Sequence, residues 1–209
     1  MVVSIHQPEH FPYLGFFQKM EESDLFIILD DVKFKKNNFQ NRNRFLNSKG
    51  EEEWFTVPVE KKANSKLIKD VLVSEDFGWK RKLAKQMKLN FGYDFGNIYE
   101  SDYIKDINMS SIRFCRKKLD INTPMIYSSD LDVNGSKSEL LYNLCKEVGA
   151  VTYLSGQGGL NYLDMDIFNG MNLKVFEPKV DNYYTTLSYL GDKMGYEKRD
   201  KQNKGRLLQ

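Results

Sequence analysis

Polar side chains that can move protons or bind anions fall in three short stretches of the chain. His6 and His10 provide imidazole rings that can act as a general base, and Gln7 adds an amide that can bind a ligand. The pair Asp30–Asp31 provides carboxylates that can act as a base or hold Mg²⁺ through a phosphate-bearing ligand. The run from Ser155 to Gly159 is rich in glycine, so its backbone can approach an anion closely. These residue types suit a reaction that removes a proton and stabilises negative charge.

A fourth polar stretch reads FQNRNRF. It consists of Phe39, Gln40, Asn41, Arg42, Asn43, Arg44 and Phe45. In an extended chain the side chains alternate between two faces, so the arginines share one face and the asparagines the other. Guanidinium groups suit carboxylate or phosphate, and amides suit hydroxyl-bearing or amide-bearing ligands. We therefore expect Gln40, the asparagines and the arginines to contact a ligand, with an ion pair between Arg42 or Arg44 and Asp30 or Asp31 as the alternative.

The elements that would position these residues begin with a βαβ unit. Residues 2–5 are typical of a buried strand, which Pro8 ends. Leu14, Phe17 and Met20 then recur at helical spacing, and the apolar run 25–29 indicates a second buried strand. Two strands joined by one helix are predicted to be parallel.

Further elements are predicted from the same kinds of pattern. They are strands at 54–59, 67–73, 125–127, 151–154 and 173–176, and helices at 79–90, 107–119 and 136–149. The fold class is therefore α/β: a mainly parallel, Rossmann-like sheet with helices on both faces and a small inserted β-rich region. Ligands of such sheets bind beyond the carboxyl ends of the strands, so His6, Asp30–Asp31 and the Ser155–Gly159 loop are expected around one pocket.

Composition limits the class of protein. The 209 residues and an apolar fraction of 41% predict one folded domain, with a basic tail from about residue 193 that we interpret as solvated. The net charge of +2 and the basic helix at 79–90 give no strong indication of nucleic acid. Cys115 and Cys145 are predicted to be buried thiols, and no metal site is expected. No apolar run is long enough to span a bilayer, so we expect a cytoplasmic protein.

The chain resembles the WbqC-like family over nearly its whole length. The resemblance is carried by His6–Pro8, Phe11–Phe17, Lys19, Asp24, Leu29–Val32, Gln40–Arg44, Thr56–Val59, Trp79, Tyr153–Gly156 and Tyr162–Asp164. One departure is Gly191, which follows Leu187–Leu190 where the family pattern has Asp. Members occur largely in bacterial surface-polysaccharide gene clusters, and the resemblance implies a transferase for which a glycine-transfer role has been suggested.

The leading hypothesis is an enzyme that attaches an aminoacyl group, with glycyl as one candidate, or an acyl group to an amino sugar or nucleotide-linked sugar. His6, Asp30 or Asp31 would be the base, and Arg42 and Arg44 would hold phosphate or carboxylate. Gln7, His10 and residues Ser155, Gly156, Gly158 and Gly159 would bind the ligand. ATP or another nucleotide with Mg²⁺ is the candidate cofactor. The alternatives are a nucleotide-dependent enzyme, a nucleic-acid base-modifying enzyme and a non-catalytic carbohydrate-binding protein.

Overall fold

The protein is described by a computed structural model covering residues 1–47, 49–76, 78–161 and 163–191. A five-stranded sheet has the order β5-β2-β1-β6-β7, and every pair of neighbours in it is parallel. Its strands are β1 (Val2–His6), β2 (Leu25–Ile28), β5 (Met125–Tyr127), β6 (Thr152–Gly156) and β7 (Asn172–Phe176). The predicted α/β fold with a parallel sheet is confirmed.

The described chain contains α-helices and several short 3₁₀ turns. The labelled α-helices are α1 (Leu14–Glu21), α2 (Gly78–Phe91), α3 (Ile104–Lys118) and α4 (Lys137–Glu147), and residues 186–191 are also helical. The 3₁₀ turns span Ala63–Ser65, Ile68–Asp70, Gly96–Tyr99, Ser128–Asp130, Gln157–Asn161 and Met165–Phe168. The expected basic tail lies outside the described residues.

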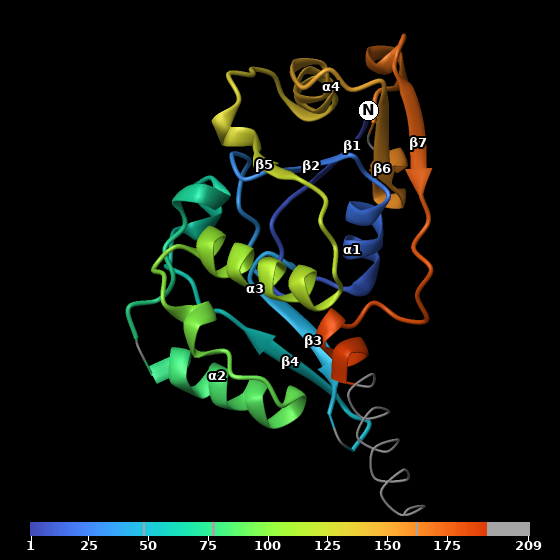
Figure 1. The fold of residues 1–209 in the computed structure, drawn as a ribbon. Helices are drawn as coiled ribbons and strands as arrows, with labels where there is room; N and C mark the ends of the chain where they lie inside the picture. The colour runs from blue at the N-terminus through green and yellow to red at the C-terminus, as the bar shows by residue number, and fades with distance from the viewer. Residues whose placement is uncertain (48, 77, 162, 192–209) are drawn as a thin grey trace, which may run out of the picture.

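Helices cover both faces of the sheet, as Figure 1 shows with α4 above it and α1 and α3 below. The alternation of side chains along β2 explains the two layers, because Ile27 packs in the cluster with α4 whereas Phe26 and Ile28 pack with α1. The larger, lower cluster continues into the β-hairpin and α2, so the inserted region shares its core with the sheet.

The inserted region differs in part from the sequence prediction. An antiparallel pair, β3 (Arg42–Leu46) and β4 (Glu52–Thr56), forms the small second sheet. The stretch predicted as a strand at 67–73 is instead a 3₁₀ turn at Ile68–Asp70 with isolated bridges on either side. The stretch buries its apolar residues Ile68, Val71 and Val73. Their spacing is compatible with a turn as well as with a strand, so the sequence pattern does not distinguish the two.

The order of the strands determines where a ligand site can form. The chain moves from β1 to β2 on one side and returns to place β6 on the other side of β1. The carboxyl ends of β1 and β6 therefore flank the point where the strand order reverses, which is where open α/β sheets bind ligands. β1 ends at His6 and β6 ends at Gly156.

Candidate active site

A cavity of about 760 Å³ opens at this point of the sheet. His6 and Gln7 form one side of it, and Ser155, Gly156, Gln157, Gly158 and Gly159 form another. Residues from α1 and α4, Leu29 and Val32 after β2, and Phe176 at the end of β7 with the segment that follows it form the rest of the wall. A cavity of this size suits a small-molecule ligand. The structure thus brings together the first and third of the clusters that the sequence predicts to share a pocket.

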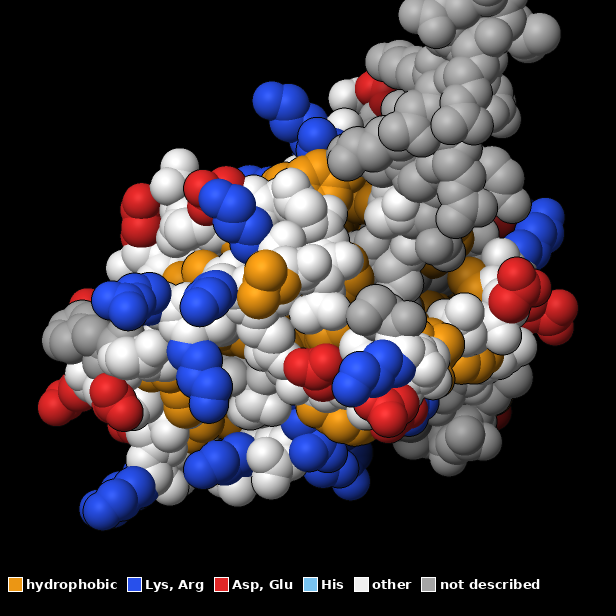
Figure 2. Space-filling model, turned by 90° about the horizontal axis from the view of Figure 1, so that it is seen from below, with side chains coloured by type: hydrophobic (Ala, Val, Ile, Leu, Met, Phe, Trp, Pro, Cys, Tyr) orange, Lys and Arg blue, Asp and Glu red, His pale blue; other side chains and the backbone are white. Residues whose placement is uncertain are grey.

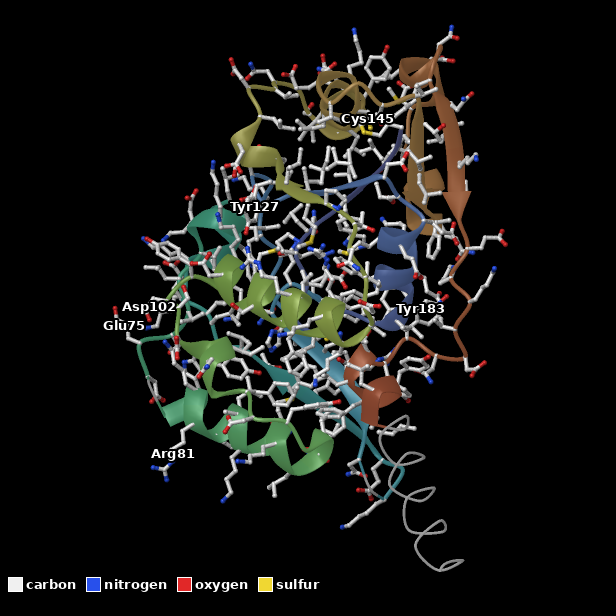
Figure 3. The ribbon with its side chains drawn as sticks, in the orientation of Figure 1. Glu75, Arg81, Asp102, Tyr127, Cys145 and Tyr183 are labelled. Atoms are coloured by element: carbon white, nitrogen blue, oxygen red, sulfur yellow. The ribbon has the colours of Figure 1, made fainter. Side chains whose placement is uncertain are left out.

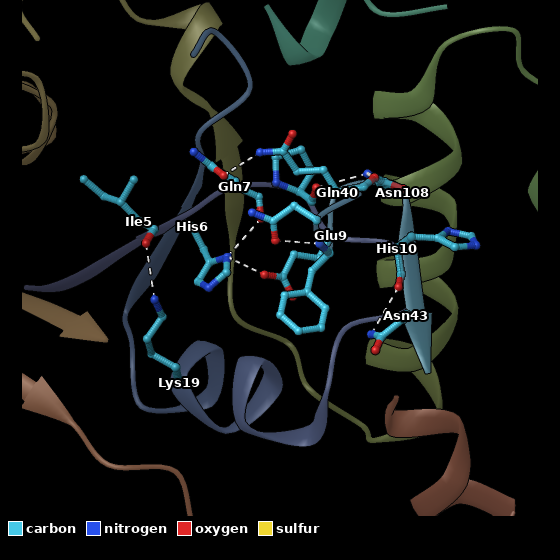
Figure 4. A network of polar contacts seen from close by, with 12 residues as sticks. Ile5, His6, Gln7, Glu9, His10, Lys19, Gln40, Asn43 and Asn108 are labelled. Carbon is cyan, nitrogen blue, oxygen red and sulfur yellow. Dashed lines mark hydrogen bonds and ion pairs between the residues drawn. The ribbon is translucent and has the colours of Figure 1, made fainter. Parts of the chain in front are cut away.

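The His6 ring is held in one tautomer with one nitrogen left free. Its Nδ1 lies 3.0 Å from the backbone carbonyl oxygen of Gln7 and 4.0 Å from Glu9 Oε1 (Figure 4). A carbonyl oxygen can only accept, so in the neutral ring Nδ1 carries the proton and Nε2 is the basic nitrogen. Burial, helped by the charge of Lys19, lowers the pKa of His6 below its usual value, so the ring is neutral near pH 7.

Glu9 and Lys19 join His6 in a cluster that the sequence interpretation did not identify. Lys19 is only 4% exposed, lines the cavity, and its Nζ donates to the carbonyl oxygen of Ile5 at 3.2 Å. Burial lowers the pKa of Lys19 and raises the pKa of Glu9, and each effect is opposed by the charge of the other residue. His6 and Lys19 therefore line the cavity as a desolvated base and a desolvated cation, and Glu9 lies close to His6 without lining the cavity itself.

The glycine-rich loop presents bare backbone to the cavity. A Cβ atom on Gly156 or Gly158 would meet no atom within 4 Å, whereas one on Gly159 would lie 2.1 Å from Ser155 Oγ. Gly159 is thus required for the close approach to Ser155, and the other two glycines leave space open. Lys137 at the start of α4 also lines the cavity.

Buried amides hold the segment that carries His6. Asn43 Nδ2 donates to the carbonyl oxygens of Phe11 (2.8 Å) and His10 (3.4 Å), and Asn108 Nδ2 donates to those of Pro8 (3.0 Å) and Gln40 (2.7 Å). Gln40 Nε2 also donates to Gln7 Oε1 at 2.7 Å (Figure 4). The inward face of FQNRNRF is therefore polar because it satisfies the backbone of residues 8–11.

These contacts also fix an unfavourable backbone conformation. Phe11 has a φ of 44°, in the left-handed region that bulky residues avoid. Its N–H donates to Ser111 Oγ, and its carbonyl oxygen accepts from Asn43 and from the Thr185 hydroxyl. Hydrogen bonds from three separate parts of the chain therefore hold the turn that follows His6 in this conformation.

His10 and Asn41 lie in the interior and not at the cavity. The His10 ring is fully buried among aromatic side chains, with Nε2 3.3 Å from the Tyr99 hydroxyl and Nδ1 without a partner among the described residues. Burial lowers the pKa of His10 to about 3. Asn41 Nδ2 donates to the carbonyl oxygen of Val57.

Asp30 and Asp31 are not themselves among the residues that line the cavity, although Leu29 and Val32 on either side of them are. Asp30 is fully buried and accepts from the backbone N–H and hydroxyl of Ser129, with Lys105 Nζ at 3.3 Å. Asp31 shares the Ser128 hydroxyl. The partners of both carboxylates come from the turn after β5 and from α3, so the two side chains are directed to that side of β2. The catalytic role predicted for these carboxylates stays a prediction.

Arg42 and Arg44 also lie outside the cavity lining, on the outward face of the hairpin. The Arg42 guanidinium lies 4.4 Å from the Trp54 ring centroid, and Arg44 forms a 3.0 Å ion pair with Glu52. Phe45 is buried, whereas Phe39 is 36% exposed. The ligand contacts predicted for both arginines stay predictions. Arg44 pairs with Glu52 in place of the alternative ion pair with Asp30 or Asp31.

Two absences apply to the described part of the chain. No three or more His, Cys, Asp or Glu side chains there are grouped in a way that could hold a metal ion. Within the same residues, no helix combines the length and apolarity needed to cross a bilayer. Cys115 and Cys145 are free, buried thiols whose pKa values burial raises.

Comparison with known proteins identifies a relative and a matching family for this chain. The chain is 27% identical over 194 residues to an uncharacterized protein of Mycobacterium tuberculosis (strain ATCC 25618 / H37Rv), Rv1507c, with 87% of this chain and 83% of the relative covered. No solved structure matches the chain. The model of the WbqC-like protein family matches residues 7–190, which include His6's neighbours, α1 and the glycine-rich loop. The chain belongs to the WbqC-like protein family.

Proposed function

We propose that the protein is a transferase that attaches an aminoacyl or acyl group to the amine of an amino sugar, with His6 as the general base. The observation that carries the proposal is the His6 ring, fixed through Nδ1 and lining a cavity at the strand-order reversal. A role in surface-polysaccharide synthesis, with glycyl as the transferred group, rests on the family resemblance alone.

The chemistry asks for a base, a cation and anion-binding backbone in one place. The acceptor nitrogen forms a bond to the acyl carbon, and the carbonyl electrons move to oxygen. His6 Nε2 takes the proton from the attacking nitrogen. The oxyanion then expels the donor's leaving group, to which His6 returns the proton. Lys19 and the backbone of the glycine-rich loop are placed to stabilise the oxyanion.

Binding of an anionic substrate would change the pKa of His6, the proposed base. In the empty cavity, burial and Lys19 hold the pKa of His6 low, which favours the unprotonated ring but makes it a weak base. A phosphate bound near Lys19 would raise that pKa toward neutrality, because an opposite charge favours the protonated ring. Substrate binding and activation of the base are thereby coupled.

The lining also fits part of the expected cofactor. Its lysines and glycine-rich backbone fit the phosphates of ATP or another nucleotide, but no carboxylate among the described lining residues is offered to Mg²⁺.

The test uses the purified protein with a nucleotide-linked sugar that carries a free amine, and glycine donated either as an ATP-derived adenylate or as a thioester. Mass spectrometry should detect the glycylated sugar. His6→Gln should lower the rate by about 10²-fold or more, while a thermal-shift assay shows substrate binding unchanged. Glu75→Gln is the control, since Glu75 is exposed and lies outside the cavity lining, and should retain activity. Transfer at the wild-type rate by His6→Gln would contradict the proposed base.

A further inference from the structure

Two tyrosines form an aromatic wall at the cavity. Tyr13, just before α1, and Tyr183, from the segment after β7, both line it, and their ring centroids lie 5.2 Å apart at an interplanar angle of 43°. Tyr183 is 51% exposed, and Figure 3 shows it beside α1. Burial raises the pKa of Tyr13 to about 12, so its hydroxyl stays neutral. We call Tyr13 and Tyr183 the tyrosine wall.

The segment that carries Tyr183 is tethered on both sides. Gln18 on α1 binds Lys179 through two hydrogen bonds of 3.0 Å, one to the backbone N–H and one to the carbonyl oxygen. On the other side, Thr186 N–H donates to the carbonyl oxygen of Pro12 at 2.9 Å. Tyr183 therefore extends from a segment whose ends are fixed to α1 and to the residues before it.

Gly15 allows the tyrosine wall to sit close to α1. A Cβ atom there would lie 2.4 Å from Tyr13 Cε2 and 2.7 Å from Pro178 Cβ. Only a residue without a Cβ lets both the Tyr13 ring and Pro178 pack against the first turn of the helix. The position of the tyrosine wall against α1 therefore depends on Gly15.

The rest of the cavity points to an anion. Among the described lining residues, Lys19 and Lys137 are basic and none is acidic. Sites that bind neutral sugars need acceptors for hydroxyl protons, whereas lysines and exposed glycine backbone suit phosphate. A ring platform and phosphate-binding groups thus share one cavity.

We propose that the tyrosine wall binds the base of a nucleotide whose phosphates lie toward Lys137 and the Ser155–Gly159 loop. This inference rests on the proposed function and deepens it: the amino sugar, or the donor, is linked to a nucleotide. Stacking on an aromatic side chain tolerates any base, so the wall recognises the ring and the loop recognises the phosphates.

The test measures binding, independently of transfer, by titration calorimetry with the four ribonucleoside diphosphates, inorganic pyrophosphate and a methyl glycoside of an amino sugar. At least one nucleoside diphosphate should bind more tightly than pyrophosphate. Tyr183→Ala should weaken that binding by about tenfold or more and leave pyrophosphate binding unchanged, as expected for one lost stacking contact. Tyr183→Phe should bind like the wild type. Tyr103→Ala, at an exposed tyrosine outside the cavity, is the matched control and should also bind normally.

Three outcomes would overturn the inference: no preference for a nucleoside diphosphate over pyrophosphate, an equal loss of both ligands in Tyr183→Ala, or a Tyr183-dependent affinity confined to the methyl glycoside. His6→Gln separates this inference from the proposed function, because it should lower the rate of transfer by about 10²-fold or more and keep nucleotide binding. If the protein binds a nucleotide through Tyr183 but shows no transfer activity, the proposed transferase function is refuted. The proposed nucleotide binding by the tyrosine wall is then still supported.

Discussion

The two histidines of the first loop are chemically alike but have different environments. His6 reaches the cavity with 27% of its side chain exposed, while His10 is fully enclosed by Phe11, Phe55 and Tyr99. Their spacing in the sequence does not distinguish them, because the turn at Phe11 that sends His10 inward depends on distant partners, Asn43 and Ser111.

The burial of His10 has a consequence for acid stability. Its pKa is about 3 in the folded protein against an ordinary 6.5, so below pH 6.5 the unfolded chain binds a proton that the folded chain does not. The stability contributed by the neutral ring is present above pH 6.5 and is lost as the pH falls toward 3. Each such proton changes the free energy of unfolding by about 1.4 kcal/mol per pH unit.

We therefore predict that His10→Gln has a shallower loss of stability between pH 6 and pH 4 than the wild type, by about 1.4 kcal/mol per pH unit. Denaturant unfolding at a series of pH values measures the slope. The difference between the two proteins isolates His10, because the effect of His6, which has the same sign, and that of Glu9, which has the opposite sign, are common to both. Parallel curves would show that His10 is not the titrating group.

A signal for Lys19 was present in the sequence. Phe16, Lys19 and Met20 lie on one side of α1, so a lysine at this position falls among residues that pack into the core. Glu9 gave no comparable signal, since nothing local indicates that the loop around it is buried. Tyr183 could not be assigned either, because its partner Tyr13 is distant in the chain.

At the scale of elements, the alternation of apolar runs predicted the βαβ unit and the parallel sheet, but not the strand order. The joint placement of His6, Asp30–Asp31 and the glycine-rich loop required β1, β2 and β6 to end at one site. In the structure β1 lies between β2 and β6; Leu29 and Val32, which follow β2, line the cavity, but the Asp30 and Asp31 side chains between them do not. The order of the elements along the chain does not determine on which side of β1 the strand β6 is added.

The glycine-rich loop offers a matched pair of substitutions. Neither Gly158 nor Gly159 has a positive φ, so the backbone conformation allows a side chain at both positions. Whether a side chain is tolerated there depends only on the space around its Cβ atom. We predict that Gly158→Leu changes the free energy of unfolding by less than about 1 kcal/mol but removes the thermal stabilisation by a nucleoside diphosphate, because the new side chain enters the cavity. Gly159→Ala should instead destabilise the fold by about 1–3 kcal/mol through its clash with Ser155.

Thermal melts of both variants, with and without ligand, check this pair. A Gly158→Leu protein that is still stabilised by the nucleotide would place the ligand away from the loop. Equal destabilisation by both substitutions would show that the loop is structural throughout.

At the scale of the whole molecule, basic and acidic side chains of the described residues lie close together on the surface. Figure 2 shows lysines and arginines interspersed with acidic side chains on the face seen from below. α2 contains no acidic residue, but Lys80 pairs with Asp102 at 3.1 Å and Lys88 with Asp94 at 3.6 Å. The basic helix is thus partly neutralised by its neighbours, as a solvated face would be.

This distribution predicts weak binding to nucleic acid through α2. Counterion release makes binding to DNA fall steeply with salt only when several phosphates are neutralised together, by roughly 10³–10⁵ between 50 and 200 mM for six to ten contacts. We expect the double variant Lys82→Glu/Lys85→Glu, which reverses two exposed charges of α2, to bind a DNA duplex as weakly as the wild type does and with the same salt dependence. Fluorescence anisotropy over that salt range measures both quantities. A steep salt dependence that the double variant abolishes would make α2 a nucleic-acid surface and favour the base-modifying alternative. A steep dependence that the variant leaves intact would instead locate the contact elsewhere on the chain.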